Sequence, residues 1–105
     1  MKIAIASTNG TEVNQHFVLA DKFYIFEKKN GKTNFIETRK APDDLQNMEM
    51  PDINVDRLKK VINIVEDCNV IYSLKIGDEP AKHLKEKGIF PLTYSGPVDK
   101  LLKNI

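Results

Sequence analysis

The chain has 105 residues, of which 41% are hydrophobic and 30% are charged, and its formal net charge is +1 at pH 7. This size indicates one globular domain over residues 1–105, and the weak net charge argues against a dedicated nucleic-acid-binding protein. No apolar run approaches the roughly 20 residues that a membrane-spanning helix requires, and "MKIAIAS" at the start is too short for a signal-peptide core. We therefore expect a cytoplasmic protein with neither nucleic acid nor membrane as a partner.

Three strands are predicted in the first part of the chain. "KIAIAS", residues 2–7, is apolar on both faces, which is typical of a central strand covered on both sides. A polar loop follows over residues 9–15. Residues 22–29 and 32–39 are aromatic and β-branched runs that flank Asn30–Gly31, a pair favoured in type I′ turns, so they predict an antiparallel hairpin.

Residues 40–53 contain two prolines and no sustained period, and we expect a connecting loop there. The next segment predicts a helix over residues 54–68, with Asn54 as its N-cap. One face of this helix carries an apolar stripe, formed by Val55, Leu58, Val61, Ile62 and Val65.

Strands and helices alternate in the remainder of the chain. "NVIYSLK" predicts a strand and "DEPAKHLKEKG" a helix capped by Asp78 or Glu79, with Gly88 just past its end. "IFPLTY" predicts a short strand, and "GPVDKLLKNI" a last helix with Pro97 near its start. This order predicts an α/β fold with a five-stranded mixed sheet of ribonuclease H-like shape. Numbered along the chain, the expected strand order is 3-2-1-4-5.

The chain has few histidine and cysteine residues, which often bind metals or act in catalysis. The single cysteine, Cys68, excludes an intramolecular disulfide and any metal site built from several cysteines of this chain. The expected topology places Cys68 and His16 at opposite ends of the sheet, so Cys68 is expected to be a buried structural residue. His83 is expected on a solvent-exposed helix face. No catalytic constellation is visible, and we expect the protein not to be an enzyme.

Three stretches resemble a known family: "MKIAIAST-G--V--HF--A--F-IFE", "EDCNVIYSLKIGDEPAKHLKEKGIFPL" and "GPVDKLL". They are similar to the dinitrogenase iron–molybdenum cofactor biosynthesis family, which includes NifX-like and NafY-like carriers and the C-terminal domain of NifB. The resemblance implies a ribonuclease H-like fold and metallocluster binding in nitrogen fixation. It also implies an iron–sulfur cargo, the iron–molybdenum cofactor or a precursor, with metallocluster donor and acceptor proteins as partners.

Two motifs carry the site that the resemblance implies. The family's usual His-Phe-Gly reads His16-Phe17-Val18 here, and its frequent Gly-Gly-Ile-Gly reads Leu74-Lys75-Ile76-Gly77. His16 is the implied metal ligand; the other reading is an exposed loop histidine. The substituted glycines also leave open an alternative function, a protein–protein interaction or regulatory module of the same fold that has lost the cluster.

The remaining candidates surround His16. Phe17 is expected to anchor the loop in the core and also to wall a pocket. Lys75, Gly77 and Asp78 lie where a strand ends and a helix begins, an arrangement that favours anions; the other reading is an ordinary turn whose helix Asp78 caps. The expected cofactor-binding set is thus His16, Phe17, Lys75, Gly77 and Asp78. The expected function is a non-enzymatic carrier, monomeric or weakly homo-oligomeric.

Overall fold

The computed structural model describes residues 1–41 and 55–105. Most of the predicted loop 40–53 and the predicted N-cap Asn54 lie outside the described residues. The elements are β1 (Lys2–Ala6), β2 (Glu12–Val13), β3 (Lys22–Lys29), β4 (Lys32–Lys40), α1 (Val55–Ile64), β5 (Val70–Ser73), α2 (Asp78–Glu86), β6 (Phe90–Thr93), β7 (Gly96–Pro97) and α3 (Val98–Lys103). Within the described ranges, no helix is long and apolar enough to cross a bilayer.

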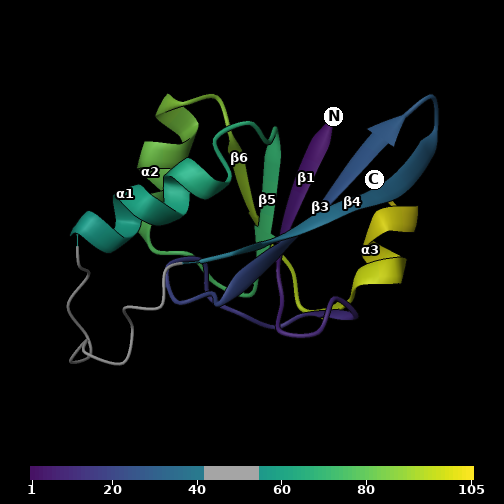
Figure 1. Cartoon of the computed structure of the whole chain (residues 1–105), viewed down its shortest axis with the longest axis horizontal. Helices are drawn as coiled ribbons and strands as arrows, with labels where there is room; N and C mark the ends of the chain where they lie inside the picture. The colour runs from purple at the N-terminus through teal and green to yellow at the C-terminus, as the bar shows by residue number, and fades with distance from the viewer. Residues whose placement is uncertain (42–54) are drawn as a thin grey trace.

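Five strands form one mixed sheet in the order β4-β3-β1-β5-β6 (Figure 1). β1 pairs antiparallel with β3, where Ile3 lies opposite Phe26, and parallel with β5, where Ile3 lies opposite Val70. The hairpin strands β3 and β4 are antiparallel, whereas β5 and β6 are parallel. The predicted five-stranded mixed sheet with a central first strand is therefore confirmed.

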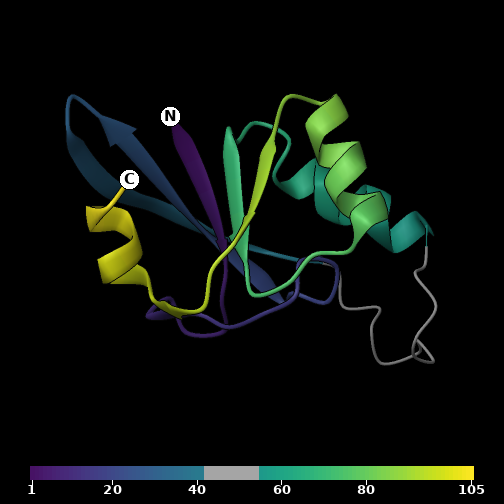
Figure 2. The same cartoon turned by 180° about the vertical axis from the view of Figure 1, so that it is seen from behind.

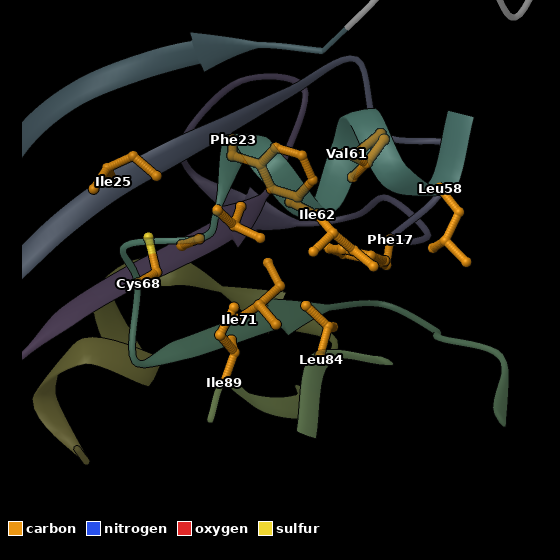
Figure 3. Close-up of a cluster of buried hydrophobic side chains, with 14 residues drawn as sticks. Phe17, Phe23, Ile25, Leu58, Val61, Ile62, Cys68, Ile71, Leu84 and Ile89 are labelled. Carbon is orange, nitrogen blue, oxygen red and sulfur yellow. The ribbon is translucent and has the colours of Figure 1, made fainter. Parts of the chain in front are cut away.

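Each face of β1 is buried in its own core. Ala4 and Ala6 face a large cluster that contains side chains of α1 and α2, and their small size lets the helices approach the sheet (Figure 3). Ile3 and Ile5 face a smaller cluster formed with α3. All four side chains are fully buried, so the two-sided burial predicted from "KIAIAS" is confirmed.

The hairpin turn lies at Asn30–Gly31, as predicted. Their φ angles are 54° and 79°, and a type I′ turn requires positive φ at both central positions. β3 and β4 change register between Ile25 and Phe26, which marks a bulge. The second strand extends to Lys40, one residue beyond the prediction.

The two long helices begin or end differently from the predictions. α1 ends at Ile64, and turns stabilised by backbone hydrogen bonds connect it to Cys68. The predicted stripe residues Leu58, Val61, Ile62 and Val65 are buried. α2 has Gly77 as its N-cap and no capping hydrogen bond from a side chain, so the prediction that Asp78 or Glu79 caps it was wrong. Gly88 follows the end of α2 with φ 80°, as predicted.

A second, two-stranded sheet pairs β2 with β7, where Val13 lies opposite Gly96. Sequence analysis assigned these residues to a loop and to the start of the last helix, which instead begins at Val98. Two-residue strands are too short to show a period, and this pairing joins segments more than 80 residues apart.

β6 is an edge strand of the sheet, and one of its faces carries exposed apolar side chains. The N–H groups of Phe90 and Tyr94 donate to carbonyl oxygens of Asn69 and Ser73, so residues at even positions direct their N–H groups towards β5. Pro91 therefore occupies an outward position of the ladder, where it offers no N–H. The side chains of Phe90 and Leu92 are 65% and 44% exposed.

Candidate functional site

The candidate site lies at the end of the sheet where β1 and β5 finish. Figures 1 and 2 show the connection after β1 and the connection from β5 to α2 at the same end of the molecule, opposite the N-terminus. His16, in the first connection, forms an isolated parallel bridge with Lys75, in the second. Residues paired in this way direct their side chains to the same side of the backbone, so the side chains of His16 and Lys75 leave the bridge in the same direction.

Backbone hydrogen bonds hold the chain on both sides of His16. The N–H of Leu74 donates to the carbonyl oxygen of Gln15 (2.9 Å), and the N–H of Phe17 donates to that of Lys75 (3.0 Å). His16 itself is exposed, whereas Phe17 is fully buried. A flexible loop is therefore not what presents His16: a short extension of the sheet holds its backbone.

Phe17 anchors this segment in the large core, as predicted. Its ring packs against Phe23 with 5.8 Å between centroids, and Figure 3 shows it among the side chains of α1 and β5. Complete burial means that Phe17 contributes no surface to a ligand, so the expectation that it also walls a pocket is not met.

Polar side chains order the rest of the connection after β1. Ser7, which is fully buried, accepts hydrogen bonds from the N–H groups of Asn9 and Gly10. Asn14 accepts from the N–H of Thr8 and donates to its hydroxyl group. These contacts give the segment from the end of β1 to Asn14, which includes β2, a defined shape.

The turn from β5 to α2 carries Lys75, Gly77 and Asp78, and the parallel bridge brings Lys75 beside His16. Gly77 is the N-cap, with φ −72° and ψ 162°, and its extended backbone needs no glycine. Because no side chain caps α2, the expected capping of the helix N–H groups by Asp78 is wrong. Asp78 and Glu79 are exposed in the first turn, where they favour the helix but oppose a bound anion.

Cys68 lies at the other end of the sheet, as predicted. It precedes β5, whereas Lys75, the bridge partner of His16, follows that strand, and Figure 3 places Cys68 and Phe17 at different ends of the core. Cys68 is 4% exposed, and burial, reinforced by the neighbouring Asp67 carboxylate, raises the pKa of its thiol to about 11. It is therefore a protonated structural residue at neutral pH.

An ion-pair network covers that second end. Asp67 accepts hydrogen bonds from Arg39 (2.6 and 3.0 Å) and from Lys2 (2.9 Å), and Arg39 also contacts Glu37. The hydrogen bonds from Arg39, followed by that from Lys2, hold the pKa of Asp67 well below its usual range. The network ties β1, β4 and the turn after α1 together, far from His16.

His83 lies on the exposed side of α2, as predicted. Its Nε2 is 3.4 Å from a carboxylate oxygen of Glu79, one helical turn earlier. Among the described residues, no three His, Cys, Asp or Glu side chains gather in a way that would hold a metal ion. In the described part of the chain, His16 thus belongs to no such cluster, and Lys75 is its partner in the bridge.

Sequence reasoning missed Arg57. Its side chain is fully buried, although it does not belong to the apolar stripe of α1. Its Nε donates to the carbonyl oxygen of Val18 (3.0 Å) and its Nη2 to that of Ala20 (2.9 Å). A charged residue beside an apolar stripe is usually solvated, so the sequence carried no signal for this contact.

Comparison with known proteins identifies the family of this chain. The family model described as "Dinitrogenase iron-molybdenum cofactor" matches residues 1–105. This chain belongs to that family. It is 30% identical over 103 residues to the FeMo cofactor biosynthesis protein NifB of Frankia alni, with 98% of this chain and 20% of that protein covered. The NifB of Klebsiella pneumoniae is 28% identical over 91 residues, covering 85% of this chain and 19% of that protein.

Solved structures share the fold of this family member. PH0822 aligns with a TM-score of 0.75 at 16% identity, covering 98% of this chain and 87% of the other. The protein mj0327 of Methanocaldococcus jannaschii aligns with a TM-score of 0.63 at 20% identity, covering 98% and 85%. The chain spans about a fifth of the length of the curated NifB relatives.

Proposed function

We propose that this chain is a non-enzymatic carrier of an iron–sulfur metallocluster, the iron–molybdenum cofactor or a precursor of it. The observation that carries the proposal is the position of His16, exposed on a backbone held by β5 and directly beside Lys75. Membership of a family named for this cofactor supports the same cargo. The sheet, antiparallel on one side of β1 and parallel on the other, supports assigning the fold to the ribonuclease H-like class.

Each residue has a distinct part in this proposal. The neutral imidazole of His16 is a ligand for an iron atom at the edge of the cluster, since imidazole suits iron when deprotonated. The ammonium group of Lys75 offsets the negative charge of the sulfide-rich cargo. The N-terminus of α2, where Gly77 supplies no capping side chain, adds a smaller positive potential, which Asp78 and Glu79 oppose.

One imidazole and one ammonium group give modest affinity, which suits a protein that receives a cargo and passes it on. A donor protein and an acceptor protein are the partners that such a role requires. The relatives named NifB are about five times longer, so we propose no part of their remaining chemistry for this chain.

The test is an anaerobic titration of the protein with isolated iron–molybdenum cofactor, followed by gel filtration, absorption spectroscopy and metal analysis. The wild type should elute with iron and molybdenum. His16→Ala should lower the affinity by about tenfold or more, since even the loss of an outer-shell contact has an effect of that size. His83→Ala, which removes the other exposed histidine, is the matched control and should bind like the wild type.

His16→Ala should also leave the free energy of unfolding within about 0.5 kcal/mol of the wild type, because exposed side chains contribute little. Equal binding by wild type and His16→Ala would remove His16 from the site. The absence of binding by both proteins would exclude the carrier role for this cargo.

A second candidate is a protein–protein interaction or regulatory module of the same fold. The exposed, adjacent side chains of Phe90 and Leu92 on β6 favour it, because apolar surface of this kind marks contact sites. The substitutions relative to the family's usual glycines, at Val18 and at Leu74-Lys75, point the same way. If neither the wild type nor the two variants bind the cofactor in the titration, that result would favour this candidate.

A further inference from the structure

Arg57 is the largest fully buried side chain among the described residues, and it is charged. Burial of a guanidinium group is strongly unfavourable unless hydrogen bonds replace its water. The bonds of this group include two from one edge of its plane, to the carbonyl oxygens of Val18 and Ala20. A group kept in the core in this way fixes the backbone that it contacts.

The contacted backbone is the continuation of the candidate site. Val18 and Ala20 follow His16 and Phe17, and the N–H of Ala20 also donates to the carbonyl oxygen of Phe17. The rigid fork of an arginine sets the spacing of the two carbonyl groups, which a flexible ammonium group cannot do. Arg57 therefore determines how the chain turns immediately after His16.

Two restraints thus enclose His16. Before and after it, hydrogen bonds with Leu74 and Lys75 hold the chain against the extension of β5. Beyond Phe17, Arg57 holds the chain against α1. Without the second restraint, the two hydrogen bonds and the packing of Phe17 are left to hold the bridge between His16 and Lys75.

We infer that Arg57 is a positioning residue, which holds the His16 segment in register with Lys75 from the opposite side of the core. The inference rests on the proposed function in assigning importance to His16, but the restraint on the backbone exists whether or not a cluster binds. Arg57 acts through Val18 and Ala20 and does not itself touch the cargo.

The test uses two variants. Arg57→Met keeps a long side chain and removes its hydrogen-bond donors. Arg57→Lys keeps the positive charge but lacks the planar guanidinium group. Lys59→Met, exposed on the same helix, is the matched control. The first readout is amide hydrogen exchange of Phe17 and Leu74, whose N–H groups form the bridge beside His16. Exchange of Ile5 and Ile71, in the central strands, reports general stability.

In Arg57→Met we expect the Phe17 and Leu74 amides to exchange at least about tenfold faster, with the Ile5 and Ile71 amides changed much less. Arg57→Lys should show an intermediate effect, and it tests the same expectation if Arg57→Met does not fold. In the cofactor titration, Arg57→Met should lower the affinity by about tenfold, as is usual for groups that orient a metal ligand.

Unchanged exchange at Phe17 and Leu74 in both variants would overturn the inference. Faster exchange to the same degree at all four amides would also overturn it, because that result describes a purely structural residue. If the wild type binds no cofactor, the proposed function fails, and the exchange data still decide whether Arg57 positions His16.

Discussion

His16 and Lys75 are direct neighbours across a parallel bridge, although 58 residues separate them in the chain. The bridge adds one more parallel pair beside the end of β5, beyond the regular sheet, and brings a histidine and a lysine together. Hydrogen bonds on either side of His16 hold the backbone of this pair, so the proposed carrier would have this backbone arrangement before it binds its cargo. Such preorganisation lowers the entropic cost of binding.

Lys75→Gln should weaken cofactor binding at low salt by about threefold to tenfold, because it removes the positive charge beside His16. The difference from the wild type should shrink as the ionic strength rises, since salt screens exposed charges. Lys85→Gln, on the exposed side of α2, is the control and should bind like the wild type. An effect of Lys75→Gln that is independent of salt would contradict a role through charge.

Asp78→Asn should strengthen binding of the anionic cofactor by about threefold, because it removes a negative charge from the exposed N-terminus of α2. Asp99→Asn makes the same change in the first turn of α3, away from His16, and should leave the affinity unchanged. The titration described above measures both. Weaker binding by Asp78→Asn would show that its carboxylate supports the site rather than opposing the cargo.

Asp67→Asn should lower the stability of the protein at neutral pH, because it breaks the contacts with Arg39 and Lys2. The pKa of Asp67 is depressed in the folded state, so its contribution is present above the ordinary carboxyl pKa of about 4 and disappears as the pH falls below it. Its side chain is 47% exposed, and allowing for solvent screening we expect a loss of about 1 kcal/mol at pH 7.

Urea unfolding of the wild type and Asp67→Asn between pH 7 and pH 2 measures this effect. The two curves should converge as the pH falls, and Glu86→Gln, a neutralisation on the exposed side of α2, should match the wild type throughout. A constant difference across the range would mean that packing, and not the charge of Asp67, stabilises this end of the sheet.

Cys68 should react with iodoacetamide at pH 7.5 at least about a hundredfold more slowly in the native protein than in denaturant. Burial raises the pKa of its thiol to about 11, so little of the reactive thiolate is present. Intact-protein mass spectrometry at timed intervals provides the measurement. Equal labelling rates in native and denatured samples would contradict the buried position.

Local patterns predicted most of this fold because the deciding interactions are local. Asn30–Gly31 allows positive φ in a two-residue turn, and the stripe from Leu58 to Val65 has helical spacing. The two-sided burial of "KIAIAS" followed from its composition. The position of Phe17 in the core followed from its being a large apolar residue in a polar loop.

The features that were missed depend on long-range contacts. Arg57 is buried because Val18 and Ala20 turn their carbonyl groups towards α1, which nothing in its own segment indicates. The cap of α2 was misplaced because Asp78, a favourable capping residue, lies one position inside the helix instead of before it. The sheet of β2 and β7 exists only through tertiary pairing.

Pro91 gives the two edges of the main sheet different capacities for association. On the outer side of β6 it removes a donor, so an added strand cannot complete its ladder there. In the part of the chain that the structure describes, β4 is the other outer strand, nine residues long, with Lys32 and Lys40 at its ends. Growth of a fibre by strand addition needs two edges that each accept a complete ladder, and the β6 edge of the described sheet does not. Edge-to-edge association of this protein should therefore stop at a pair.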